Sequence, residues 1–505
     1  MALSKEQRKS LAGIRKLIKS TAWVDVRQGL VLISAADDPA LWAVLAEGVR
    51  FSAEGRLLLG EGEIKKRVKK VHRVGVALAV ARQVGLLESM TTLDLSGSGI
   101  EDLQPLRGLV NLTALNLSEC PAVQDLRPLA GLSSVETLEL SFNQGSGRWN
   151  AILTSLDGLE GLVSLTTLDI RGCKALQDIQ ALKGLVRLTA LNLINCQSLS
   201  DLSGLEGLSS LQELNLNGCT AVTRLQALSG LTTLTTLDLS RCAMSDLRSL
   251  SALSGLRSLR IYSGKHLSDL SGLEGLSSLK GLQLRLCERV TDLQPLSGLT
   301  SLSTLDLQDC RALVDLSGLE GLVSLTSLDL YECVALQDLR PLKALKGLTL
   351  RFGHPGMGDL SPLKALTNLT TLHLNHGTSW SWHFANSALS DLSPLKALTS
   401  LTLLTLGYCK RLSDGEINAL REALPDCEIL RRRTFSVFDR HTDAQLRELG
   451  VPLERLLLVR AACTDRRIAA LEDTLSAATF EALMYLHAGL EYSEVVAFHQ
   501  ASAAQ

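Results

Sequence analysis

The chain has 505 residues, of which 46% are hydrophobic but only 4% are aromatic, and its formal net charge is −2. A chain of this length ordinarily forms about three domains, but so few aromatic residues disfavour several ordinary mixed cores and favour one repetitive leucine core. The charge is uneven, because residues 1–90 carry 16 Lys and Arg against 9 Asp and Glu, whereas residues 91–430 carry 26 against 34.

The N-terminal sequence MALSKEQRKS is charged. No apolar run approaches the roughly 18 residues that a membrane span requires. The sequence therefore predicts neither a cleavable secretion signal nor a transmembrane helix. We expect a cytoplasmic protein, which leaves open export by a route that needs no cleavable signal.

Residues 1–90 contain helical segments and end with the apolar stretch VGVALAVARQVGLL. This pattern predicts a mainly helical N-terminal capping domain that covers the first coil of the repeats described next. The basic run EIKKRVKKVHR, residues 63–73, could contact anionic partners or act as a nuclear address. A solvated helix face is the commoner explanation of such a run.

Residues 91–430 consist of an internal repeat. Pairs of the L-x-L type recur along this region, and most of their spacings are 22 or 23 residues. The pairs begin at Leu93, Leu115, Leu138, Leu168, Leu191, Leu214, Leu237, Leu259, Leu282, Leu305, Leu328, Leu348, Leu372 and Leu404. With a degenerate last coil near Cys427, the region contains about 14–15 coils.

Each regular unit, such as LNLINCQSLSDLSGLEGLSSLQE from Leu191, has a short alternating strand, a polar or Cys turn, a D-L-x-x-L segment and a second leucine pair. This pattern resembles the leucine-rich repeat proteins, and it is most similar to the internalin and phosphatase-regulator type with coils of 22–23 residues. The resemblance implies an α/β leucine-rich repeat solenoid. In this fold a curved parallel β-sheet carries 3₁₀ or short helical turns on its convex side, and here helical regions flank it.

The chain departs from that type by placing Cys where Asn is usual. In nine coils the residue five positions after the first leucine of the pair is a cysteine. These nine of the eleven cysteines are Cys120, Cys173, Cys196, Cys219, Cys242, Cys287, Cys310, Cys333 and Cys409. No C-x-x-C occurs, and stacked coils lie too far apart for a relaxed disulfide. We therefore predict a ladder of buried free thiols, with metal binding and redox function as disfavoured alternatives.

A second recurring residue is an aspartate that precedes a short L-x-x-L element. We predict that these carboxylates cap free N–H groups of 3₁₀ or helical turns and do not form a carboxylate site. They are Asp102, Asp125, Asp178, Asp201, Asp246, Asp269, Asp292, Asp315, Asp338, Asp359 and Asp391.

Function is therefore expected on the inner strand face, where the residue between the two leucines and the residue after them point away from the core. The early coils place Asp, Asn and Glu there, whereas the later coils add Tyr, Arg and His, which favour interface hot spots. The predicted binding positions on this face are Tyr331, Arg351, His373 and Tyr408. A merely solvated sheet face is the alternative.

Two insertions interrupt the period, and insertions in solenoids become loops that are frequently functional. The first, residues 141–155, carries Trp149, and the second, residues 375–388, carries Trp380, Trp382, His383 and Phe384. We predict that these aromatic residues are anchors for a partner. Packing of the loops against the leucine core is the alternative.

Residues 431–505 are predicted to form a small helical domain. Its faint helix-turn-helix pattern does not favour DNA binding, because no Lys or Arg follows Arg467. The element Cys463-Thr464-Asp465 resembles the C-x-D motif of bacterial effector ubiquitin ligases, but the catalytic domain of that family is several times longer than this region.

The resulting prediction is a non-enzymatic scaffold or recognition module, of a bacterial and effector-like kind if the resemblance extends to function. Its expected partner is a protein bound on the concave face and the insertion loops, without a cofactor, a metal ion or a membrane. A ubiquitin-ligase-like transferase using Cys463 and a nucleic-acid-associated protein using the basic N-terminal region are the alternatives.

Overall fold

The structure is a computed structural model. It describes residues 4–17, 28, 39–60, 73–142, 153–354, 357–374, 388–406, 409 and 411–431. The chain divides into two compact units, a first unit of residues 1–279 and a second unit of residues 280–505. The division predicted from the sequence, with boundaries at residues 90 and 430, stays a prediction.

The first unit begins with helical elements and a hairpin. The helices are α1 (Lys5–Leu17), α3 (Pro39–Ala46) and α5 (Arg73–Gln83). Strands β1 (Val49–Phe51) and β2 (Leu57–Leu59) form an antiparallel hairpin that the sequence pattern did not predict. The middle of helix α5 is apolar and buried, with Val76, Leu78 and Val80 fully inaccessible to solvent.

The hairpin turn contacts the first repeat strand through its backbone. The amide of Asp94 donates to the carbonyl of Gly55 at 3.1 Å. Gly55 has a φ of +80°, and a Cβ atom at this position would lie 2.2 Å from the carbonyl oxygen of Thr92. Only glycine fits such a close backbone approach. The turn thus covers backbone groups at the edge of the first repeat strand, as an end cap of a solenoid must.

The coils of the first unit each contribute one short strand. The strands are β3 (Thr92–Asp94), β4 (Ala114–Asn116), β5 (Thr137–Glu139), β6 (Thr167–Asp169), β7 (Ala190–Asn192), β8 (Glu213–Asn215), β9 (Thr236–Asp238) and β10 (Ser258–Tyr262). Neighbouring strands pair in parallel with leucine opposite leucine, including Leu138 opposite Leu168 across the first insertion. The insertion therefore leaves the register of the sheet unchanged.

The second unit continues the pattern. Its strands are β11 (Gly281–Arg285), β12 (Thr304–Asp306), β13 (Ser327–Tyr331), β14 (Thr349–Gly353), β15 (Thr371–Leu374), β16 (Leu403–Leu406) and β17 (Glu428–Arg431). Helix α6 (Asp414–Ala423) precedes β17, and the hydroxyl of Ser413 caps it by accepting the amide of Glu416 at 3.1 Å. In the described part of each unit the strands form a parallel sheet whose order follows the sequence, from β3 to β10 in the first unit and from β11 to β17 in the second.

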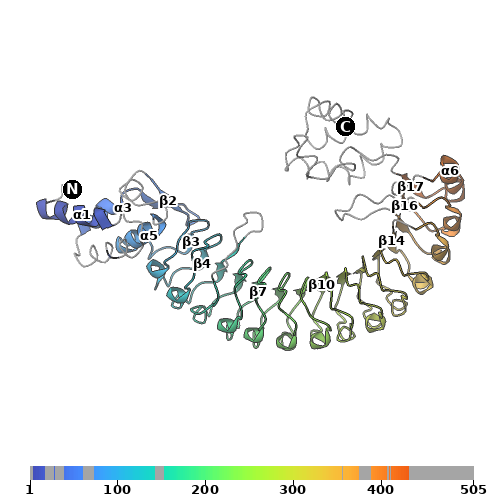
Figure 1. Cartoon of the computed structure of the whole chain (residues 1–505), viewed down its shortest axis with the longest axis horizontal. Coiled ribbons are helices and arrows are strands. Elements are labelled where there is room, and N and C mark those ends of the chain that lie inside the picture. The colour runs from blue at the N-terminus through green and yellow to red at the C-terminus, as the bar shows by residue number, and fades with distance from the viewer. Residues whose placement is uncertain are drawn as a thin grey trace, which may run out of the picture. The chain divides into compact units, whose positions relative to one another are not determined.

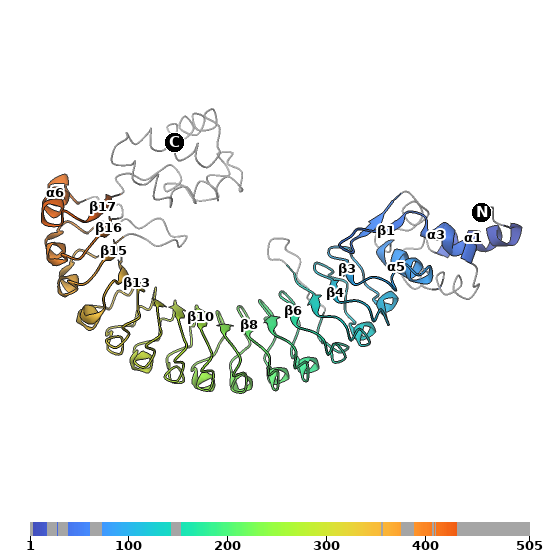
Figure 2. The same ribbon diagram turned by 180° about the vertical axis from the view of Figure 1, so that it is seen from behind.

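Short 3₁₀ helices form the other side of the coils. In each unit the strands lie on one side of the coil and these turns on the opposite side (Figure 1 and Figure 2). The turns are η2 (Gln104–Leu106), η3 (Arg127–Leu129), η5 (Gln180–Leu182), η6 (Ser203–Leu205), η7 (Gln226–Leu228) and η8 (Arg248–Leu250), followed by η9 (Gln294–Leu296), η10 (Arg340–Ala344), η11 (Ser361–Ala365) and η12 (Ser393–Ala397).

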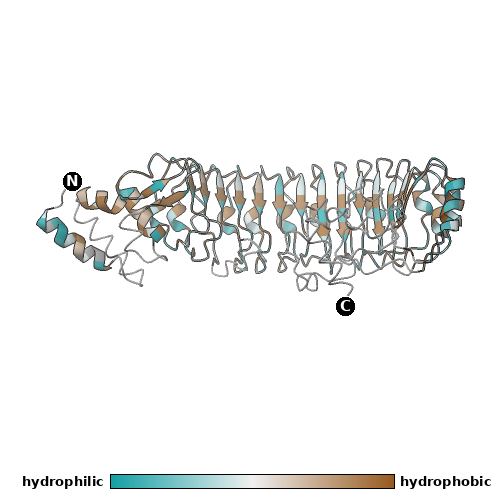
Figure 3. Cartoon of the chain, turned by 90° about the horizontal axis from the view of Figure 1, so that it is seen from above, coloured by the Kyte–Doolittle hydropathy of each residue, from teal (hydrophilic) through white to brown (hydrophobic). Residues whose placement is uncertain are grey.

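Leucine side chains fill the space between the strands and the turns. In a regular coil such as that of Leu214, the strand residues Leu214 and Leu216 and the turn residues Leu225 and Leu228 are at most 4% exposed. Brown apolar residues accordingly alternate with teal or pale residues along the strands in Figure 3. This is the architecture of a leucine-rich repeat solenoid, so the predicted fold class is confirmed.

The predicted aspartate caps are confirmed. In all eleven cases a carboxylate oxygen accepts the backbone N–H of the residue two positions later, at 2.8–3.2 Å. The pair Asp201 and Ser203 is typical, because Ser203 is also the first residue of η6. The Ser203 hydroxyl also donates to this carboxylate at 2.7 Å, and this hydrogen bond, followed by that of the Ser203 amide, lowers the pKa of the Asp201 carboxyl.

The cysteine ladder is also confirmed, because all nine cysteines at the repeat address are buried free thiols. Seven of them donate S–H to the carbonyl of the second apolar strand residue in the preceding coil, at 3.0–3.9 Å. Cys219, for example, donates to Leu193 at 3.1 Å. The thiols thus satisfy carbonyl groups at the strand ends, where Asn would otherwise serve. Burial raises the pKa of Cys219 to about 12.

The residue just before the ladder position has a left-handed backbone. Gly97, Gly172 and Gly218 occupy it in three coils, with φ between 62° and 82°. Non-glycine residues adopt φ between 54° and 61° at the same address, namely Glu119, Asn195, Arg241, Ser263, Leu286, Asp309 and Glu332. The left-handed turn is therefore imposed by the coil and not by glycine.

Candidate functional site

One coil has a different register from the one that the L-x-L pattern predicts. Leu350, and not Leu348, lies opposite both Leu328 and Leu372. This coil is one residue shorter than the 23-residue coil, and Leu348-Thr349-Leu350, which ends at the paired position, has the same L-x-L pattern as a repeat strand. In the sheet, Leu350 is the first apolar strand residue and Phe352 is the second. Arg351 therefore replaces Thr349 between the two apolar strand residues. Gly353, which lies five residues after Leu348, is accordingly the last residue of β14.

The acidic and amide residues of the strand face have a structural task. Wherever Asp or Asn stands between the two apolar strand residues, its side chain accepts the N–H two residues later at 2.9–3.2 Å. These residues are Asp94, Asn116, Asp169, Asn192, Asn215, Asp238, Asp306 and Asp329. Seven of the eight end their strand, with Asp329 as the exception. Strands β10, β11 and β14, which carry Arg or Gln at that position, run for five residues.

In the second unit, residues that do not accept such a bond lie beside two that do. Pairing of β11 to β16 places one polar residue from each strand in a single row across the strand face. The row, called the second-unit row below, consists of Gln283, Asp306, Asp329, Arg351, His373 and Thr405. The structure thus brings together two of the predicted site residues, because Arg351 lies directly opposite His373.

Two carboxylates lie at the centre of this row. Asp306 is opposite Asp329 on the next strand, and Asp329 is only 9% exposed. Arg351 Nη1 approaches Asp329 Oδ2 at 3.4 Å, whereas Arg285 Nε is 3.6 Å from Asp306 Oδ2. Burial of Asp306, followed by the negative charge of Asp329, raises its pKa to about 6 despite these guanidinium groups. The row therefore contains a carboxyl group that titrates close to neutral pH.

His373 continues the row towards β16. Its Nδ1 lies 2.8 Å from the hydroxyl oxygen of Thr405, which is its partner in the sheet register. The imidazole is half-buried, and so is Arg351, whose side chain is 42% exposed. These two side chains give the row its accessible donor groups beside the buried carboxylates.

Tyr331 lies on the predicted strand face but is not exposed as predicted. Its side chain is only 6% exposed. Burial and the neighbouring Glu332 carboxylate, to which the phenol is hydrogen-bonded, raise the pKa of the phenol well above its ordinary value. The strand periodicity predicted the direction of this residue but not its burial. Tyr331 therefore acts here as a packing residue with a satisfied hydroxyl group.

Sequence reasoning missed a second polar group at the ends of β12 and β13. Gln308 accepts a hydrogen bond from Arg285 and donates one to Asp309 at 3.2 Å. Arg311 contacts Asp309 at 3.1 Å and the Glu332 carboxylate at 3.8 Å. The repeat register could have found most of these residues, because Arg285, Gln308, Asp309 and Glu332 lie two or three positions after the residue between the two apolar strand positions of their coil, whereas Arg311 lies five positions after Asp306.

The remaining predicted site residues lie outside the described part of the chain. They are the insertion residues Trp149, Trp380, Trp382, His383 and Phe384, together with Tyr408 and the candidate nucleophile Cys463. Phe142, at the start of the first insertion, is described and is 1% exposed, so this aromatic residue belongs to the core.

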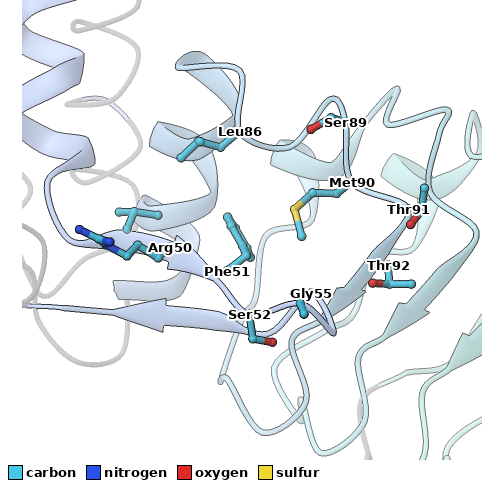
Figure 4. Close-up of a pocket in the computed structure, with 11 residues that line it drawn as sticks. Arg50, Phe51, Ser52, Gly55, Leu86, Ser89, Met90, Thr91 and Thr92 are labelled. Carbon is cyan, nitrogen blue, oxygen red and sulfur yellow. The ribbon is translucent and has the colours of Figure 1, made fainter.

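Two depressions accompany these features. One, of about 550 Å³, lies between the N-terminal hairpin and the segment that precedes β3, and Phe51, Leu86 and Met90 line it (Figure 4). Among the described residues of its wall, only Arg50 is charged. The other, of about 870 Å³, lies beside the shortened coil after β14, with Phe352, His354 and Met357 among its lining residues. The first has little charged lining, whereas Asp338, Arg340, Asp359 and Lys364 are among the residues that line the second.

Within the described ranges, no group of three or more His, Cys, Asp or Glu side chains is arranged to hold a metal ion. The helices of the same ranges are all too short or too polar to cross a membrane.

Comparison with known proteins gives structural matches only. No protein-family model matches the chain, and no curated protein sequence matches it. Among solved structures, the chain is similar to the internalin InlF of Listeria monocytogenes, with 24% identity over 73% of this chain and 94% of that one and a TM-score of 0.49. It is also similar to a leucine-rich repeat protein of Leptospira interrogans, with 22% identity over 70% and 98% and a TM-score of 0.46.

Proposed function

We propose that the chain is a non-enzymatic protein-recognition module whose second unit binds a protein partner across the second-unit row. The observation that carries the proposal is the pairing of Arg351 with His373 on neighbouring strands. Asp and Asn at the equivalent strand position accept the backbone N–H two residues later. Within the described part of the chain, Arg351 and His373 do not form this hydrogen bond, so we infer that their polar groups are directed to the strand face. A rigid sheet that presents accessible Arg and His beside buried carboxylates suits specific recognition of a partner surface.

The second insertion belongs to the same proposal. Residues 375–387, with Trp380, Trp382, His383 and Phe384, follow β15 directly in the sequence, and β15 carries His373. Aromatic side chains next to an Arg-containing surface are the residue types that dominate interface energies. We propose that these residues, with Tyr408 and Trp149, supply apolar anchors around the row. A cytoplasmic location remains part of the proposal.

The test is a comparative capture experiment with the full chain as bait. Proteins retained by the wild type are compared with those retained by an Arg351→Ala/His373→Ala variant. The matched control is Arg340→Ala, because Arg340 is exposed, forms an ion pair with Asp338 and starts η10 on the opposite side of the coil. We expect a partner that is lost from the double variant and retained by the control.

Circular dichroism and thermal melting must show that the double variant is folded. A partner retained equally by all three proteins would show that the second-unit row is not its binding surface. Deletion of residues 378–385 then tests the loop separately, because loss of the partner from this variant alone would place the anchor in the loop.

A further inference from the structure

The strand face of the first unit changes character at its last strand. From β3 to β9 the residues between the two apolar strand positions are all acidic or amide. They are Asp94, Asn116, Glu139, Asp169, Asn192, Asn215 and Asp238. On β10 the same position is Arg260, and the strand continues to Tyr262. Residues two apart in a strand share a face, so Arg260 and Tyr262 both lie on the strand face.

A second arginine is placed against the tyrosine ring. The guanidinium carbon of Arg241 lies 5.5 Å from the centroid of the Tyr262 ring. Arg241 occupies the left-handed position after β9, with φ of 61°, and its amide donates to the carbonyl of Tyr262 at 2.8 Å. The amide of Tyr262 donates to the hydroxyl of Ser240 at 3.0 Å, and this bond fixes the backbone that carries the ring. Arg241, Arg260 and Tyr262 are called the Arg–Tyr patch below.

The charges of the patch are not neutralised within the described chain. Arg241 and Arg260 are exposed and make no ion pair with a described carboxylate, whereas Arg171 and Arg248 are each paired with an aspartate. Asp238 lies opposite Arg260 in the sheet, but its carboxylate accepts the amide of Ser240. Tyr262 is 38% exposed, which is unusual for a large aromatic side chain in this core-rich chain. The patch therefore offers two available guanidinium groups around an accessible ring.

We propose that the Arg–Tyr patch binds an acidic segment of a protein partner, with carboxylates of that segment on Arg241 and Arg260. Guanidinium groups bind carboxylates through directed, charge-assisted hydrogen bonds. The Tyr262 ring supplies rigid contact area between the two charges. The surface lies wholly within the first unit and shares no residue with the second-unit row, so it does not depend on the function proposed above.

An acidic peptide fits this surface better than a nucleic acid. Binding of a nucleic acid typically requires neutralisation of about six to ten phosphates. The patch has two arginines, with Lys265 as the next exposed cation along the chain. The strands before it present Glu139, Asp169 and Asp238, which would repel an extended phosphate backbone. A short acidic peptide can instead place its charges on the patch alone.

Fluorescence anisotropy with a labelled oligoglutamate peptide tests the proposal on the full chain. We expect salt-sensitive binding that weakens at least roughly tenfold in an Arg241→Glu/Arg260→Glu variant, because attraction becomes repulsion. The matched control is Arg257→Glu, an exposed arginine of the same coil that precedes β10 and has no ion pair with a described residue. Tyr262→Phe should preserve binding, whereas Tyr262→Ala should weaken it.

Thermal melting identifies any unfolded variant, and the single substitution Arg241→Ala then replaces the double one. Equal losses of peptide affinity in the double variant and in Arg257→Glu would overturn the proposal, since they would show that the peptide responds only to the net charge of the protein. Absence of peptide binding by the wild type would also overturn it. If a single-stranded oligonucleotide binds more tightly than the peptide, the proposal of an acidic peptide is wrong and the partner is a nucleic acid.

Discussion

Asp306 and Asp329 lie opposite each other on neighbouring parallel strands, and burial of Asp306, followed by the negative charge of Asp329, raises the pKa of Asp306 to about 6. The folded protein therefore binds a proton at Asp306 more tightly than the unfolded chain, in which the carboxyl has its ordinary pKa of 3.8. The contribution of this group to stability is complete below that ordinary value and is lost as the pH rises through the folded-state pKa.

The pH dependence can be tested with Asp306→Asn. We expect the wild type to lose up to about 3 kcal/mol of unfolding free energy from this group between about pH 4 and pH 7. The asparagine variant should lack this loss, because it is neutral throughout and its Oδ1 can still accept the amide of Gln308. Urea unfolding at several pH values measures both proteins. Parallel pH profiles would show that Asp306 is not shifted.

The aspartate caps predict the opposite pH behaviour. Asp201→Ala should cost about 1 kcal/mol at neutral pH, because the amide of Ser203 loses its acceptor, whereas Asp201→Asn should cost less. Hydrogen bonds lower the pKa of Asp201, so its stabilising effect is present at neutral pH and is lost as the pH falls through the folded-state value. The difference between wild type and Asp201→Ala should therefore shrink in acid.

Denaturant midpoints at neutral and acidic pH provide the measurement for the cap. Asp426→Ala is a suitable control, because Asp426 is exposed and makes no hydrogen bond with a described residue. A loss of equal size in this control would show that the effect comes from surface charge and not from capping.

The left-handed position before the ladder residue predicts substitutions of opposite effect. Gly97 has φ of 62°, and no heavy atom lies within 4 Å of the place that a Cβ atom would take, so Gly97→Ala should cost about 1 kcal/mol through backbone strain alone. Ser263 has φ of 60° at the same address in another coil, and Ser263→Gly should stabilise the protein by a similar amount. Shifts of the denaturation midpoint in the same direction for both variants would contradict this account.

Burial of the thiol ladder predicts resistance to alkylation. Burial raises the pKa of Cys173 and Cys333 to about 12, so the reactive thiolate is scarce at neutral pH. We expect iodoacetamide to leave the nine ladder cysteines unmodified in the native protein and to modify them in denaturant, as mass spectrometry of the peptides can show. A cysteine introduced at Val323, which is 75% exposed, is the positive control. Rapid native labelling of most ladder cysteines would refute the assignment.

The repeat period made much of the fold predictable. A leucine at a fixed spacing sets which strand residues are buried, and a Cys or Asp at a fixed address meets the same backbone groups in every coil. The sequence could therefore predict that Cys219 is a buried thiol and that Asp201 is a cap. The period failed at Leu348, because deletion of one residue created a second L-x-L pair beside the one that the sheet uses.

The candidate site was less predictable from the sequence. The repeat period determines which face of the strand a side chain points to, but it does not determine how deeply that side chain is buried or which hydrogen bonds it makes. Tyr331 has the position of an exposed residue, yet its ring is buried beside Glu332. Asp306 is a charged residue on the strand face, as expected of a binding residue, yet its carboxylate accepts the amide of Gln308 where the strand ends. The sequence pattern named both Arg351 and His373 as binding positions, but that they lie directly opposite each other follows only from pairing β14 with β15 in the correct register.

The most direct test of the second-unit row is photo-crosslinking from within it. A photoreactive phenylalanine analogue replaces Gln283, an exposed residue of the row, in one variant and Val323, an exposed residue outside the row, in another. Both proteins are irradiated with the partner that the wild type captures, and the adducts are identified by mass spectrometry. We expect a partner adduct from position 283 and none from position 323. An adduct from position 323 alone would contradict the claim that the partner binds across the second-unit row.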